Sequence, residues 1–200
     1  MFPKEWNGIP IPKAITAEWL KSEPCPSSGL EAYVVSLVST AKWAKTDEDV
    51  FAALPPAYRL LYRYWDLYSD IYNGGFQQYL CNKSRDGGIG INEAIEATRR
   101  FGVSPVTKLL RKAIELMAAS LPPGVLSTLS DLERNRALRR VISREELSRR
   151  LDRVDQTFGM IENPCSKVDI YIKRHPDEFI HQKLSTRDKP QQKNSCGKCC

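Results

Sequence analysis

Three thiols crowd the last five residues of this 200-residue chain. They are Cys196, Cys199 and Cys200, and a Gly-Lys pair separates the first two. This spacing allows two thiolates to bind one tetrahedral Zn²⁺, with the third thiol as a further ligand and His175 or His181 as the fourth. A disordered tail of reactive thiols and a lipidated tail are the other interpretations, and the sequence leaves all three open. No other cofactor is predicted.

A second group of residues that could bind a ligand is a run of arginines. Residues 133–153 hold eight arginines and only four acidic residues. Six of these arginines fall on one side of either of two expected helices: Arg136, Arg139, Arg140, Arg149, Arg150 and Arg153. Such a cluster is a candidate anion-binding patch for nucleic acid or for an acidic protein. A solvated surface with ion pairs is the alternative, because Glu145–Arg149 and Glu146–Arg150 have i, i+4 spacing.

A glycine pair interrupts the most aromatic part of the chain. The motif around it consists of Asn73, Gly74, Gly75, Phe76, Gln78, Tyr79 and Asn82. Glycines directly after a helix allow a positive φ and a sharp reversal. The side-chain amides can bind the backbone of this turn or of the glycine-rich loop at 86–90. We interpret the motif as a turn locked by amides, and a polar pocket formed by the three amide side chains is the alternative.

Helices must position all of these groups, since no segment alternates convincingly with period two. Helical spacing predicts one short helix near residues 17–21 in the N-terminal arm. In the domain it predicts helices near residues 30–45, from the acidic segment 46–49 onward, and near 55–72, 76–82, 92–100, 104–119, 125–139, 143–157 and 166–180. We therefore predict an all-α single domain of eight or nine short helices. The predicted organisation is a proline-rich N-terminal arm (1–29), the all-α domain (30–181) and a disordered, basic, Cys-containing tail (182–200).

The helix expected at 55–72 carries an aromatic stripe with spacings of four, three, three and four residues, formed by Tyr58, Tyr62, Trp65, Tyr68 and Tyr72. Stripes with this period mostly face a core, and we expect this one to do so. A platform for base stacking or ligand binding is the alternative. The same helix offers an ion pair between Arg63 and Asp66 at i, i+3.

The charge distribution, the N-terminal residues and the cysteine spacing together indicate the cellular compartment. The net charge of +6 comes from the arginine run and the tail, whereas residues 1–132 are neutral. The first residues do not resemble a signal peptide, and no apolar run reaches the roughly 18 residues of a membrane span. The six cysteines are not spread like a disulfide framework. These features predict a cytoplasmic protein.

The sequence offers no arrangement of nucleophile, base and orienting group. It lacks the phosphate-binding loop, the metalloprotease helix and the hydrolase serine turn. Asp152 and Asp155 form a carboxylate pair at i, i+3, but Arg149 and Arg153 flank them as expected ion-pair partners. We therefore predict that the protein is not an enzyme.

The glycine motif, with the aromatic helix before it, resembles the N-G-G-F-x-Q-[YF]-x-x-N signature of a bacterial all-α family. This family is typified by a DNA-mimic protein and is otherwise mostly of unknown function. The segment from Leu151 to Phe158 resembles its L-D-x-x-D-x-x-[FY] helix, and the segment from Ile170 to Phe179 resembles its last helix. The resemblance covers about residues 45–181 and implies a protein that occupies the DNA-binding face of a regulator.

Mimicry of DNA requires dense carboxylates, because phosphate charge dominates DNA affinity. The domain of this chain is not acidic, which argues against mimicry. We therefore expect a non-enzymatic protein-interaction module whose partner is a regulatory or toxin-like protein. The alternative is a nucleic-acid-binding protein that uses the Arg-rich helices of residues 134–153 and the basic tail.

Overall fold

The computed structural model describes residues 5–6, 9–10, 15–40, 49–50, 53–83, 89–120, 145–161 and 165–180. These residues hold seven α-helices, one 3-10 helix and one pair of two-residue strands. The elements are β1 (Glu5–Trp6), β2 (Ile9–Pro10), α1 (Ala17–Ser22), α2 (Pro26–Thr40), α4 (Pro56–Lys83), α5 (Ile89–Arg100), α6 (Ser104–Ala119), α9 (Glu145–Gly159), α10 (Cys165–Arg174) and η2 (Pro176–Glu178). The prediction of an all-α fold is confirmed.

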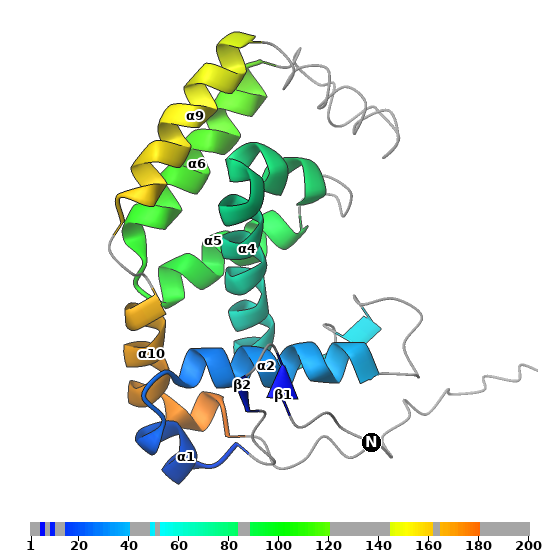
Figure 1. Ribbon diagram of the computed structural model, residues 1–200, viewed down its shortest axis with the longest axis vertical. Coiled ribbons are helices and arrows are strands. Elements are labelled where there is room, and N and C mark those ends of the chain that lie inside the picture. The colour runs from blue at the N-terminus through cyan, green and yellow to red at the C-terminus, as the bar shows by residue number, and fades with distance from the viewer. Residues whose placement is uncertain are drawn as a thin grey trace, which may run out of the picture.

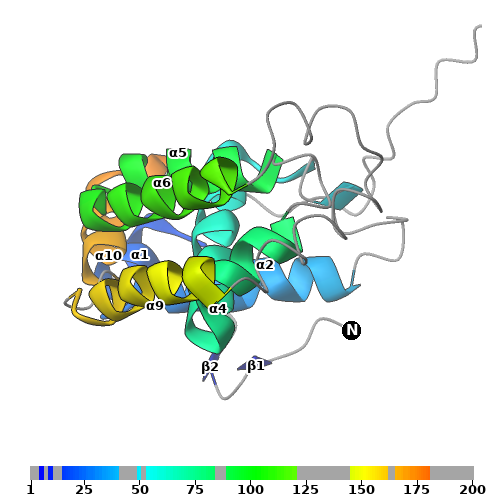
Figure 2. The ribbon, with the colours of Figure 1, turned by 90° about the horizontal axis from the view of Figure 1, so that it is seen from above.

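The long helix α4 lies at the centre of the molecule and packs against α2, α5, α6 and α9 (Figure 1). Its apolar side chains recur every three or four residues, so that Leu60, Leu61, Tyr64 and Leu67 are all buried. Helices α6 and α9 pack side by side along one flank, as the view from above also shows (Figure 2). Helix α10 packs on α2 and α1 and lies below α6 and α9 in Figure 1.

Local sequence signals set several helix ends. The hydroxyl of Thr16 accepts a hydrogen bond from the backbone N–H of Trp19 at 3.1 Å and so caps α1. Pro105 lies in the first turn of α6, where its missing N–H costs nothing. The first turn of α2 is capped from a distance, because Asp169 of α10 accepts a hydrogen bond from the N–H of Ser27 at 2.9 Å.

The boundaries differ from the sequence-based expectation in the N-terminal part of the chain. Helix α2 begins at Pro26 rather than near residue 30, and the side chain of Leu20 in α1 is fully buried. Residues 15–29, assigned to an extended arm, thus fold onto the domain. The helices expected at 55–72 and 76–82 both form as the two halves of α4, and the backbone between them leaves helical geometry at Gly74 and Gly75, as expected of the glycine pair.

Other predicted elements lie outside the described residues. These are the helix at 125–139, the C-terminal tail from 182 to 200 and the first three residues of the loop expected at 86–90. The last two residues of that loop, Ile89 and Gly90, instead form the start of α5. In the part of the chain that the structure describes, no helix combines the length and apolar character needed to cross a membrane.

The arginines of α4 form ion pairs with a neighbouring helix. Burial raises the pKa of the Asp66 carboxyl, and the charge of Arg63 opposes this larger effect, which reflects the expected proximity of Arg63 and Asp66. Nε of Arg63 donates to Oε2 of Glu93 on α5 at 2.8 Å, and Oε1 of Glu93 lies 3.0 Å from Nε of Arg59. The side chain of Arg63 is only 3% exposed, so the carboxylate from a neighbouring helix neutralises a buried charge.

Candidate interaction site at the kinked helix

The centre of the site is a break in α4 at the glycine pair. The backbone leaves helical geometry at Gly74 (φ −169°, ψ 24°) and Gly75 (φ 75°, ψ −179°) and becomes helical again afterwards. A positive φ combined with an extended ψ belongs to a region that essentially only glycine occupies. The glycine at position 75 therefore allows α4 to change direction without ending.

Asp155 on α9 closes this kink. Its Oδ1 accepts a hydrogen bond from the backbone N–H of Phe76 at 2.8 Å. The first N–H groups of a new helical segment lack partners within the helix, so this carboxylate acts as an N-cap supplied by another helix. A Cβ atom on Gly75 would lie 2.2 Å from Oδ2 of Asp155. Gly75 thus provides both the backbone geometry and the space for the carboxylate.

The environment of Asp155 is partly desolvated. Burial raises the pKa of its carboxyl above the usual value, the N–H of Phe76 opposes this shift, and the charge of Asp152 adds to it. Asp152 itself is exposed on the next turn of α9. The hydrogen bond to Phe76 therefore stabilises a carboxylate that burial would otherwise disfavour.

Side-chain contacts join the two halves of α4 across the kink. Oδ1 of Asp70 accepts from Nδ2 of Asn82 at 3.0 Å and from Nε2 of Gln78 at 3.5 Å. One turn earlier, Oδ2 of Asp66 lies 2.6 Å from Nζ of Lys83. The amides thus bind a carboxylate rather than the backbone of the turn, and the kink angle is fixed by contacts within α4 as well as by α9.

The remaining motif residues have separate roles. Asn73 is exposed, and its Nδ2 lies 3.5 Å from Oγ of Ser69. Phe76 is fully buried, and the hydroxyl of the buried Tyr79 donates to the carbonyl of Gly90 on α5 at 3.4 Å. The structure therefore brings Gln78 and Asn82 together around one carboxylate but leaves Asn73 at the surface.

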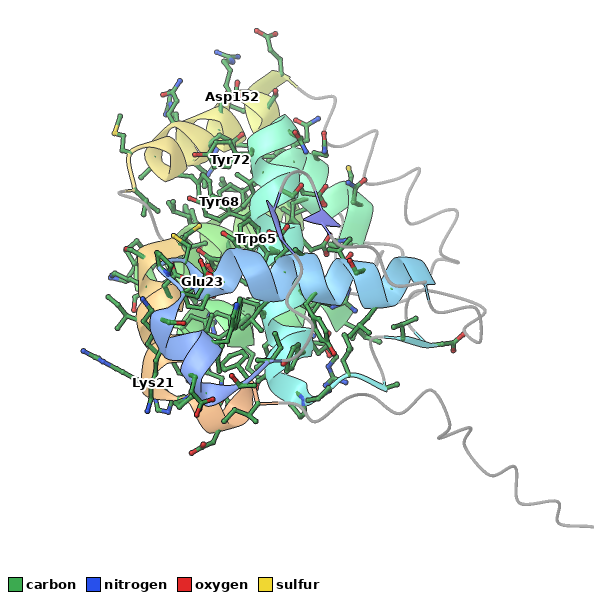
Figure 3. The ribbon with its side chains drawn as sticks, turned by 60° about the horizontal axis from the view of Figure 1, so that its bottom comes forward. Lys21, Glu23, Trp65, Tyr68, Tyr72 and Asp152 are labelled. Atoms are coloured by element: carbon green, nitrogen blue, oxygen red, sulfur yellow. The ribbon has the colours of Figure 1, made fainter. Side chains whose placement is uncertain are left out.

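Next to the kink, aromatic rings from α4 and α9 form a cluster. The ring centroid of Phe158 on α9 lies 5.0 Å from the ring centroid of Tyr68, 6.3 Å from that of Tyr72 and 5.8 Å from that of Phe76. Figure 3 shows Trp65, Tyr68 and Tyr72 in order along α4, and we call these three residues the aromatic face.

The exposure of the aromatic stripe changes along α4. Tyr58 is buried, as expected of a core residue, and Trp65 and Tyr68 are half-buried. Tyr72 is 75% exposed, although its ring contacts those of Tyr68 and Phe158. The stripe thus begins in the core and ends at the surface, beside the kink.

Sequence reasoning missed two residues that build this site, Asp70 and Asp155. Asp155 was expected to form an ion pair with a flanking arginine. The available signal was its place three residues before Phe158, which puts the carboxylate and the ring on the α4 side of α9. The spacing indicates which side of α9 carries Asp155, but it does not indicate that this carboxylate caps a helical segment 79 residues away in the chain.

The structure describes three of the six arginines of the predicted patch. Arg136, Arg139 and Arg140 lie outside the described residues. Arg149 lies 3.7 Å from carboxylate oxygens of both Glu145 and Glu146, which agrees with the expected Glu145–Arg149 pair. Arg150 and Arg153 instead line a groove between α6 and α9, together with Lys112.

The predicted zinc ligands Cys196, Cys199 and Cys200 lie outside the described residues. Among the residues that are described, no group of three or more His, Cys, Asp or Glu side chains is placed to hold a metal ion. The three cysteines in the described part, Cys25, Cys81 and Cys165, form no disulfide with one another.

Comparisons with known proteins place this architecture in a family. A search of curated proteins and a search of solved structures found no match to the chain. The family model described as DMP19-like protein matches residues 52–175, which include α4, α5, α6, α9 and α10. The match therefore contains both the glycine kink and the aspartate that closes it, and it covers more than half of the sequence. The chain belongs to the DMP19-like protein family.

Proposed function

We propose that this protein is a non-enzymatic protein-interaction module that contacts its partner through the aromatic face of α4. The observation that carries the proposal is the 75% exposure of Tyr72 at the end of a stripe that is otherwise buried or half-buried. Tyrosine offers a large contact area at a low cost in side-chain entropy, and it is enriched among the residues that dominate binding energy at interfaces.

The rigidity of the neighbouring backbone supports this proposal. Tyr72 lies two residues before the kink, which Asp155 and Asp70 hold through hydrogen bonds from Phe76 and Asn82. A surface that is already ordered before binding loses less entropy when a partner binds. The kink therefore presents the tyrosine ring in a defined position.

The use of the polar groups favours binding over catalysis. Asp155 caps a helix, Asp70 accepts from two amides and Asp66 pairs with Lys83. Each of these carboxylates has a structural role in holding the kink, and a catalytic acid or base would need access to a substrate. We therefore assign the geometry of the kink to the shape of a binding surface.

The partner class that we propose is a regulatory protein, with a toxin-like protein as the alternative. The family resemblance suggests a regulator, but the charge of this chain argues against mimicry of DNA. The region matched by the family model carries 20 basic and 14 acidic side chains. Dense negative charge is what a mimic of the phosphate backbone requires. The cysteine spacing does not resemble a disulfide framework, which suits a reducing compartment, and we propose the cytoplasm.

Affinity capture tests this proposal. The full chain is used as bait in a nuclease-treated lysate of the native host, beside the variants Tyr72→Ala and Ile89→Ala. Ile89 is a matched control, because it is 58% exposed on a different helix. We expect a protein that wild type and Ile89→Ala retain and that Tyr72→Ala loses, with about 30-fold weaker binding when the pair is purified.

Two results would contradict the proposal. One is that Tyr72→Ala retains the same partner with unchanged affinity. The other is that nuclease treatment removes every retained protein, which would indicate association through nucleic acid. Circular dichroism and thermal unfolding of Tyr72→Ala serve as the control for folding.

A further inference from the structure

A second surface lies on the other side of α9, between α9 and α6. An open groove of about 300 Å³ runs between these helices, which lie side by side in Figure 1. Its apolar part consists of the half-buried Leu109 and the edges of the core residues Leu116 and Val154, and its cationic part consists of Lys112, Arg150 and Arg153. No carboxylate belongs to the described lining of this groove. The groove therefore combines apolar surface with concentrated positive charge.

The cations of this groove are weakly neutralised. Nζ of Lys112 lies 3.8 Å from Oε2 of Glu115, but the two side chains are 56% and 68% exposed, so the pair is screened by water. Arg150 and Arg153 are exposed, and no carboxylate of the described residues pairs with either. The glutamates of the first turn of α9 pair with Arg149 instead.

The groove is separate from the aromatic face. Arg153 and Asp155 are two residues apart on α9, which places them about 200° apart around the helix axis. Asp155 contacts the kink of α4, whereas Arg153 lines the groove beside α6. A ligand in the groove therefore does not need any contact with Tyr72.

We propose that the groove between α6 and α9 binds an acidic segment of a partner protein that presents apolar side chains, as an amphipathic helix does. The apolar side chains of the segment pack on Leu109, Leu116 and Val154. Its carboxylates lie beside Lys112, Arg150 and Arg153. An amphipathic helix in a groove between two helices is a recurrent mode of peptide recognition.

Charge and shape together favour this occupant over nucleic acid. A phosphate backbone satisfies the cations, but it places polar oxygen atoms and water against Leu109, which loses the gain from burying the exposed part of that side chain. An acidic peptide with apolar side chains satisfies both parts of the groove. The complementary charge of such a segment also accelerates its association.

The test begins with a library of random linear peptides selected on the full-length protein. The groove variant combines Lys112→Gln, Arg150→Gln and Arg153→Gln. The matched control variant combines Lys108→Gln, Arg111→Gln and Arg149→Gln, which removes the same charge from exposed positions of the same helices outside the groove. Fluorescence anisotropy then measures the binding of the selected peptides and of a DNA duplex to each protein. Circular dichroism establishes that both variants are folded.

We expect selected peptides with a net negative charge and with leucine, isoleucine or phenylalanine at helical spacing. Their binding is expected to weaken about tenfold in the groove variant and less than about threefold in the control. Leu109→Gln is expected to weaken peptide binding without changing any binding of DNA.

Three results would overturn the proposal. In the first, the selection yields no acidic peptides. In the second, peptide binding is as weak in the control variant as in the groove variant. In the third, DNA displaces the peptides at equal concentration and Leu109→Gln has no effect, which would assign the groove to nucleic acid. None of these results bears on Tyr72, so this proposal and the proposed function fail independently.

Discussion

Replacing Gly75 by alanine tests whether the kink in α4 requires glycine at this position. Gly75 has φ 75° and ψ −179°, and an added Cβ would lie 2.2 Å from Oδ2 of Asp155. The substitution therefore acts in two ways. It places a side chain in a backbone region that favours glycine, and it pushes away the carboxylate that caps the second half of α4.

The two effects have separate magnitudes. A non-glycine residue in this backbone region costs about 1–3 kcal/mol. Loss of a hydrogen bond to a charged acceptor, such as that from Phe76 to Asp155, costs about 1.5–3 kcal/mol. We expect Gly75→Ala to lower the free energy of unfolding by about 3–5 kcal/mol, a large part of the stability of a typical domain. The melting temperature should fall by roughly 10 °C.

Urea denaturation followed by circular dichroism measures this loss, with Gly74→Ala as the matched control. Gly74 has φ −169°, which any residue adopts. Its Cβ would meet Oε1 and Cδ of Gln78, which can rotate away, and would lie 3.0 Å from the Cβ of Gln78, which requires a small shift. The control should cost less than about 1 kcal/mol, mainly from the weakened contact between Gln78 and Asp70.

A double-mutant cycle with Asp155→Ala separates the two effects. In the Asp155→Ala background, Gly75→Ala should cost only its backbone part, so the two substitutions should be coupled by at least about 1 kcal/mol. Equal losses for Gly75→Ala and Gly74→Ala would refute the reasoning. So would complete additivity of Gly75→Ala and Asp155→Ala.

Two further predictions concern buried charges elsewhere in the fold. Glu93→Gln should lower the free energy of unfolding by about 3 kcal/mol in urea titrations, because it removes the carboxylate charge that faces both Arg59 and the guanidinium of Arg63, which is 3% exposed. Glu31→Gln should have a stability effect that depends on pH. Burial raises the pKa of Glu31 from 4.5 to about 7, so the fold favours the protonated form, and charging it destabilises the native state as pH rises through this range. The variant should therefore be more stable than wild type at pH 8 by up to about 3 kcal/mol, and the difference should vanish below about pH 4.5. Exposed glutamates are the controls for both measurements: Glu115→Gln should change stability by less than about 0.5 kcal/mol, and Glu96→Gln should show no difference that varies with pH. A loss for Glu93→Gln no larger than that for Glu115→Gln, or a constant effect of Glu31→Gln across the pH range, would contradict the respective argument.

Much of the helical architecture follows from local patterns. The three- and four-residue spacing of apolar side chains predicted the helices at 55–72 and 104–119, and Pro105 and Gly102 mark the start of α6 and the end of α5. The start of α2 was harder to predict, because its first turn is stabilised by Asp169 from another helix. Where a helix end is stabilised by a distant residue, the local sequence carries no signal for it.

The sequence by itself determined the all-α class, the break at the glycine pair and the place of the basic residues along the chain. These depend on backbone preferences and on periodicity, which act over a few residues. Only the tertiary structure decided that Asp155 caps the kink, that Glu93 neutralises Arg63 and that Arg150 and Arg153 join Lys112 in a groove. Each of these pairings brings together side chains from different helices. Their formation depends on how the helices pack, because electrostatic contacts act over a few ångströms in space regardless of separation along the chain.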